Sequence, residues 1–113
     1  MAERSPEADA VFRDILAAYG ERPAITAKRM FGSTALLVDG KMAAFVDGRG
    51  RFVAKLPPET LERLGGAGVG EPMVMRGRAM RAWWAVPLDA GADWWALADE
   101  AVAYVHRLAN ADD

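Results

Sequence analysis

The feature that most constrains the fold is a series of three short apolar runs separated by turn sequences. The runs are "TALLV" at residues 34–38, "KMAAFV" at 41–46 and "RFVAKL" at 51–56. Asp39-Gly40 separates the first two, and this pair favours a two-residue type I′ turn because both positions require positive φ. "DGRG" separates the second and third runs and fits a slightly longer hairpin loop. The pattern predicts a three-stranded antiparallel meander.

Helical periodicity predicts three helices around this meander. Ser5 fits the N-cap of a helix over Pro6–Tyr19, in which large apolar residues recur at helical spacing. A short helix fits residues 57–64, because two prolines open it and two glycines follow it. Asp93 fits the N-cap of a last helix, which has one continuous apolar face.

A second pair of strands precedes the last helix. "PMVM" at residues 72–75 and "RAWWAVP" at 81–87 have strand-like composition, and "RGRAM" joins them. The chain of 113 residues then reads as a single domain, residues 1–113, in the order helix, three strands, helix, two strands, helix. We predict an α+β fold: a two-layer α-β(3)-α-β(2)-α domain with an antiparallel sheet and helices packed on it.

Composition argues against most kinds of active site. The sequence has no cysteine and a single histidine, His106, which excludes disulfides, thiolate zinc sites and cysteine nucleophiles. No pair of acidic residues has the spacing of a catalytic dyad, and His106 is expected near the C-terminal dipole of the last helix. We therefore expect a protein that is not an enzyme and that holds no cofactor and no metal.

The glycine-rich segment "GGAGVG", residues 65–70, is a weak candidate for nucleotide binding. It lacks the preceding strand, the following helix start and the Gly-Lys-Ser/Thr of a P-loop. We interpret it as a flexible loop. The N-terminus is polar and acidic, and no apolar stretch approaches the roughly 20 residues of a membrane helix. These features predict a cytoplasmic protein without a membrane partner.

Two short basic segments are the candidate anion- or nucleic-acid-binding residues. "KRMFG" carries Lys28 and Arg29, and "RGRAMR" carries Arg76, Arg78 and Arg81. They would form one patch if the fold brought the two segments together, with Arg76 and Arg78 on one face of an extended segment. The alternative is a solvated hairpin whose arginines pair with acids on helices. The net charge of −2 argues against nucleic acid as a general partner.

The large apolar side chains of the late strands raise a second question. Trp83 and Trp84 are adjacent in a strand, so they must face opposite sides of the sheet. One can lie in the core, and the other faces a side that is open or covered by a partner; tryptophan is enriched at protein interfaces. Partial burial at the edge of the core is the alternative. Core filling is the expected use of the strand methionines Met30, Met42, Met73, Met75 and Met80.

Three motifs resemble the N-terminal domain of the TfoX/Sxy family. They are "KRMFG" at 28–32, "VDGKMAAFV" at 38–46 and "MRAWWAVP" at 80–87, ahead of the last helix. The resemblance covers about residues 10–108. The motif positions, interpreted as mainly structural, are Met30, Phe31, Gly32, Gly40, Lys41, Trp83, Trp84 and Pro87.

The resemblance implies the same order of helices and strands as the residue patterns. It also implies a bacterial cytoplasmic protein with a non-enzymatic link to the regulation of natural competence and its transcription. Regulators of the family carry a second, C-terminal helical domain, whereas the resemblance here extends only over the first. We therefore expect a stand-alone domain. Ser33 stands where the family often has a second glycine.

Three functional hypotheses follow. The first is a regulatory or adaptor domain that contacts other proteins, whose identity the sequence does not give, with a homodimer among the candidate assemblies. The second is a nucleic-acid-binding module that uses the five basic residues of the two segments. The third is an enzyme whose acidic residues converge only in the fold.

Overall fold

The computed structural model describes residues 6–20, 22–30 and 33–111, without the side chains of Met30, Ser33 and Arg81. The elements in chain order are α1 (Pro6–Tyr19), β1 (Ile25–Met30), β2 (Ser33–Val38), β3 (Lys41–Val46), β4 (Phe52–Lys55), α2 (Pro58–Gly66), β5 (Glu71–Met75), β6 (Arg78–Val86), the short 3₁₀ helix η1 (Leu88–Ala90) and α3 (Trp94–Asn110).

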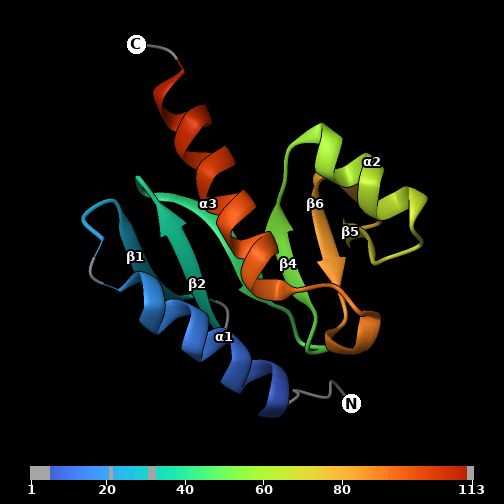
Figure 1. Cartoon of the computed structure of the whole chain (residues 1–113), viewed down its shortest axis with the longest axis horizontal. Coiled ribbons are helices and arrows are strands. Elements are labelled where there is room, and N and C mark those ends of the chain that lie inside the picture. The colour runs from blue at the N-terminus through green and yellow to red at the C-terminus, as the bar shows by residue number, and fades with distance from the viewer. Residues whose placement is uncertain (1–5, 21, 31–32, 112–113) are drawn as a thin grey trace.

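All six strands belong to one sheet, in the order β1-β2-β3-β4-β6-β5, and each neighbouring pair is antiparallel. Helices α1 and α3 lie across one face of this sheet, and α2 lies beside β6 (Figure 1). The predicted α+β class, with helices packed on an antiparallel sheet, is confirmed. None of the helices in the described part of the chain is long and apolar enough to cross a bilayer.

The predicted meander is confirmed as β2, β3 and β4. Asp39 and Gly40 have φ values of 53° and 78°, as a type I′ turn requires. The pairing of β2 with β3 shifts between Leu36 and Leu37, so β3 carries one extra residue at Ala43. Because of this bulge, both Ala43 and its neighbour Ala44 are fully buried.

Strand β1 is an addition to the predicted order. "ITAKRM" pairs along its whole length with β2 and forms one edge of the sheet. Residues 26–29 are all exposed, so the strand has none of the apolar alternation by which a half-buried strand is recognised. An edge strand needs only one hydrogen-bonding neighbour, and polar residues are favoured there because they discourage pairing with other chains. Ser5, Phe31 and Gly32, which figured in the predictions, lie outside the described residues.

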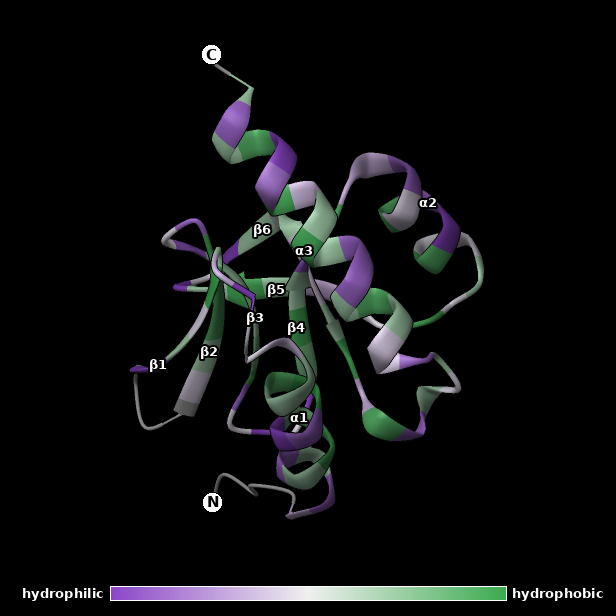
Figure 2. Ribbon diagram, turned by 60° about the vertical axis from the view of Figure 1, so that its left-hand side comes forward, coloured by the Kyte–Doolittle hydropathy of each residue, from purple (hydrophilic) through white to green (hydrophobic). Residues whose placement is uncertain are grey.

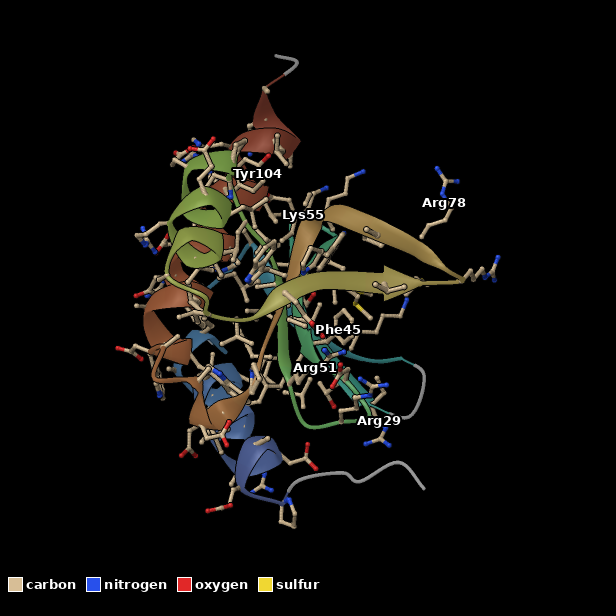
Figure 3. All side chains as sticks on the ribbon, turned by 90° about the vertical axis from the view of Figure 1, so that its right-hand side faces the viewer. Arg29, Phe45, Arg51, Lys55, Arg78 and Tyr104 are labelled. Carbon is tan, nitrogen blue, oxygen red and sulfur yellow. The ribbon has the colours of Figure 1, made fainter. Side chains whose placement is uncertain are left out.

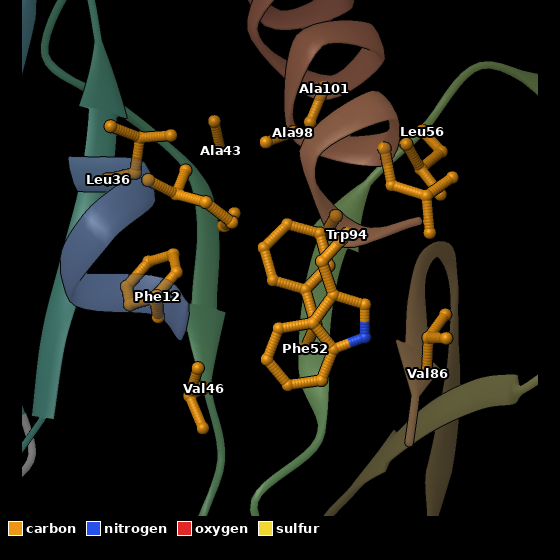
Figure 4. Packing of buried hydrophobic residues seen from close by; sticks show 14 of the residues in the cluster. Phe12, Leu36, Ala43, Val46, Phe52, Leu56, Val86, Trp94, Ala98 and Ala101 are labelled. Carbon is orange, nitrogen blue, oxygen red and sulfur yellow. The ribbon is translucent and has the colours of Figure 1, made fainter. Parts of the chain in front are cut away.

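The hydrophobic core lies between the sheet and the two long helices. Phe52 of β4 is its centre: the ring lies edge-on to Phe12 of α1, with centroids 6.0 Å apart, and stacks on Trp94 of α3 at 5.3 Å (Figure 4). Hydrophobic and hydrophilic residues alternate along the ribbons of both helices, as expected for helices with one buried face (Figure 2). Asp93 caps α3 by accepting a hydrogen bond from the Trp95 amide, as predicted.

Trp84 contacts the glycine-rich segment. Its first two glycines belong to α2, which corrects the prediction that they end the helix and begin a loop. The Trp84 indole donates a 2.8 Å hydrogen bond to the Val69 carbonyl, and its ring edge lies against Gly65. Gly70 has a φ of +73°, and a Cβ there would lie 2.5 Å from the Ala85 carbonyl oxygen. Residues 67–70 thus connect α2 to β5 and lie against β6 through Trp84 and the Ala85 carbonyl.

Candidate protein-contact surface

The two basic segments lie in different parts of the sheet. Lys28 and Arg29 belong to the edge strand β1, whereas Arg76 and Arg78 lie around the turn between β5 and β6. Three strands separate β1 from β6, which corresponds to about 19 Å in a flat sheet with strands about 4.8 Å apart. The fold therefore does not bring the two segments into one continuous cluster. Alternation along β1 also places Lys28 and Arg29 on opposite faces.

Strand β5 and the first part of β6 form a projecting hairpin, here called the arm and comprising residues 71–80. Figure 3 shows it extending away from the helices, with Arg78 near its tip. Only Arg76 and Gly77 form its turn, with φ values of 54° and 78°. This corrects the prediction of a longer joining segment in which Arg76 and Arg78 share a face, because Arg76 is left-handed rather than extended.

The arm exposes large apolar side chains. Val74 is 61% exposed, Met75 48% and Met80 37%. Met73 pairs with Met80 and Met75 pairs with Arg78, so these four side chains lie on one face of the arm. Val74 lies on the other face. The expectation that the methionines fill the core is wrong for Met75 and Met80. Met42 and Met73 are partly buried, and the Met30 side chain lies outside the described residues.

The sheet face opposite the helices, here called the open face, has an aromatic centre. Phe45 of β3 and Trp83 of β6 are partly buried, with their ring centroids 6.0 Å apart. Trp84 lies on the other side against α2, so the prediction that the two tryptophans face opposite ways is confirmed. The strand register places Lys28 and Lys55 on the same face as this aromatic pair. Phe45 and Lys55 are labelled in Figure 3.

Charge is divided unevenly between the sheet and the rest of the chain. Residues 25–56 and 71–86 hold nine Lys and Arg and three Asp and Glu, a net charge of +6. The remaining residues hold five basic and thirteen acidic side chains, a net charge of −8. The overall charge of −2 conceals this division, which a count by predicted element would have found.

All three acidic residues of the sheet segments are already engaged. Asp47 and Glu71 each lie 2.8 Å from the Arg51 guanidinium, and Asp39 lies 2.7 Å from His106 Nδ1. His106, which was predicted to lie near the C-terminal end of the last helix, therefore also has a carboxylate partner in the turn between β2 and β3. In contrast, none of the cations Lys28, Lys55, Arg76 and Arg78 forms an ion pair with another described residue.

A shallow hollow of about 420 Å³ lies between the loop after β3 and η1. Its lining includes Glu7 and Asp89 as well as Arg49 and Arg51. Arg51 is occupied by two carboxylates, and the remaining charges are of both signs. The hollow therefore does not select a ligand of one charge. Within the described residues, no three His, Asp or Glu side chains are grouped to hold a metal.

Comparison with known proteins supports the resemblance of the three motifs. The family model described as the TfoX N-terminal domain matches residues 14–107, which is most of the chain. The chain belongs to the TfoX N-terminal domain family. A search among curated proteins finds no match to it.

The described motif residues of this TfoX N-terminal domain lie in several different elements. Gly40 completes the β2–β3 turn, Lys41 begins β3 with an exposed side chain, and Pro87 immediately precedes η1. Trp84 fixes the glycine-rich segment through Val69. Trp83 differs from these, because it contributes to the open face of the TfoX domain rather than to its core.

Proposed function

We propose that this TfoX N-terminal domain is a non-enzymatic regulatory or adaptor domain that acts by contacting other proteins through its arm. The observation that carries this proposal is the exposure of Val74, Met75 and Met80 on a hairpin that no other described element covers. Contiguous exposed apolar side chains mark interaction sites, and Met75 and Met80 lie on one face of the arm. Family membership supports a place in the bacterial cytoplasm, in the regulation of natural competence and its transcription.

The composition of the arm suits contacts made by side chains rather than by strand addition. Pro72 has no backbone N–H to extend a ladder, and the left-handed Arg76 ends the strand. Methionine adapts its shape to a partner, and arginine is enriched at interfaces. A two-stranded hairpin is marginally stable by itself, so a partner that covers it would also order it.

Site-specific photo-crosslinking tests the proposal. A photoreactive amino acid replaces Met75 in one variant and Leu108 of α3 in another, and the two positions have similar exposed fractions of 48% and 44%. We expect a defined protein crosslinked at Met75 and none at Leu108, and we expect that protein, once purified, to bind the unmodified domain. Equal capture at both positions, or none at Met75, contradicts the proposal.

A second candidate, a nucleic-acid-binding module, is favoured by the net charge of +6 on the sheet segments. It would use Lys28, Arg29, Arg76, Arg78 and Arg81. Fluorescence anisotropy of labelled single- and double-stranded DNA over a salt series tests it. Binding that weakens steeply with salt, and that is lost when these five residues are replaced by Ala, supports this candidate.

A further inference from the structure

The open face and the arm together combine two kinds of group that a ligand would have to match. The apolar groups are the aromatic pair Phe45 and Trp83 on the sheet and the exposed side chains Val74, Met75 and Met80 on the arm. Burying such side chains contributes about 25 cal/mol for each Å² removed from water. A ligand that gains affinity here must therefore carry apolar side chains of its own.

Cations border these apolar groups. Lys28 and Lys55 lie on the open face, and Arg76 and Arg78 lie at the tip of the arm. None forms an ion pair with a described residue, and the three acids of the sheet segments bind Arg51 and His106 instead. The border is thus a set of positive charges without a partner on the same surface, which favours a ligand that supplies carboxylates.

We propose, on the basis of the function proposed above, that this surface binds an acidic segment of a partner protein that also carries large apolar side chains. The acidic groups contact the cations next to the apolar groups, which are Lys55 beside Trp83 and Arg76 and Arg78 at the tip of the arm. The apolar side chains of the segment cover the arm and the aromatic pair. Electrostatic complementarity of this kind sets specificity and association rate, whereas the buried apolar groups supply most of the affinity.

Two other occupants fit the same surface less well. Nucleic acid is bound mainly through its phosphates, which gain little from exposed aliphatic side chains such as those that lie beside the cations here. A second copy docked through the same surface would bring the four cations of each copy together, and like charges across an interface are costly. Both remain outcomes of the test.

The test is fluorescence anisotropy with a labelled synthetic peptide of Asp, Glu, Leu and Phe, titrated with the intact chain. The first control peptide has Lys in place of the acids, and the second has Ser in place of Leu and Phe. Single- and double-stranded DNA oligonucleotides are titrated in parallel. We expect the acidic apolar peptide to bind at least about tenfold more tightly than either control peptide, because each control removes one of the two matched features.

Charge reversal on the arm identifies the surface. Arg78→Glu is expected to weaken binding of the acidic peptide about tenfold and to strengthen binding of the Lys peptide. The matched control is Arg13→Glu on α1, which is also exposed and should change both affinities less than about twofold. Circular dichroism and thermal melting of both variants test whether each is folded.

The outcomes separate this inference from the proposed function. If DNA binds and the acidic peptide does not, the surface is a nucleic-acid site and the inference is wrong. If no probe binds but Met75 still crosslinks a protein, the adaptor function stands and only the partner chemistry is wrong. If no probe binds and Met75 crosslinks nothing, both are wrong. If Met75 crosslinks to a second copy of the chain, and analytical ultracentrifugation shows a dimer, the surface binds a second copy and the inference is wrong.

Discussion

At the scale of single residues, the connection after α2 depends on one glycine more than on its neighbours. Gly70 has a left-handed backbone, and a Cβ there would collide with the Ala85 carbonyl and the Trp84 indole. Gly68 has almost the same φ, +72° against +73°, but open space around it. Substituting Gly68 tests backbone strain alone, whereas substituting Gly70 tests the same strain together with a steric collision.

We predict that Gly68→Ala costs about 1 kcal/mol of unfolding free energy, the cost of a left-handed conformation for a residue with a Cβ. Gly70→Ala should cost clearly more, about 2–4 kcal/mol, because the collision adds to that strain. Urea denaturation of the two variants gives both values. Equal losses for both would mean that Trp84 and the Ala85 carbonyl move aside without cost.

At the scale of elements, the arm and β4 represent opposite extremes of burial. Residues 74–80 are all exposed, whereas Phe52, Val53 and Ala54 of β4 are buried, with a neighbouring strand on each side. Local opening is easiest where few buried contacts hold the backbone.

We predict that the amides of the arm exchange with deuterium much faster than those of β4. Hydrogen exchange monitored by NMR measures both rates. Equal protection would show that another molecule or another part of the chain covers the arm in solution.

The arm should also be dispensable for stability. We predict that Val74→Ser with Met80→Ser changes the unfolding free energy by less than about 1 kcal/mol, because Val74 is 61% exposed and Met80 is 37% exposed and neither belongs to the core. Phe52→Ala, in the centre of the core, should cost about 3–5 kcal/mol. Chemical denaturation measures the stabilities, and loss of the Met75 crosslink in the serine variant would separate function from folding.

At the scale of the whole molecule, the division of charge predicts a property that the net charge does not. A chain with a charge of −2 has little overall attraction to a cation exchanger, but the sheet segments carry +6. We predict retention at low ionic strength that is lost when Lys28, Lys55, Arg76 and Arg78 are replaced by Gln.

The matched control replaces four cations outside the sheet segments by Gln: Arg13, Arg22, Arg63 and Arg107. Both variants have the same net charge of −6, because each loses four positive charges from −2. The control should retain more of the interaction with the column than the sheet variant. Equal loss of retention would mean that the charges of the sheet act no differently from those of the helices.

The sequence by itself determined the features that depend on neighbouring residues. The Asp39-Gly40 turn requires positive φ at both positions, so the central hairpin could be predicted directly. The helix Pro6–Tyr19 was predicted with its observed bounds, because its cap signals and apolar spacing agree. Strand alternation was enough to place Trp83 and Trp84 on opposite faces.

The tertiary structure decided what depends on residues far apart in the chain. β1 is a strand because its backbone pairs with β2, although Lys28 and Arg29 interrupt any apolar pattern in its sequence. The strand order placed the two basic segments apart, and the projection of the arm left Met75 and Met80 exposed rather than in the core. The physical reason is that periodicity records which side chains share a face, whereas only long-range packing determines which faces are covered.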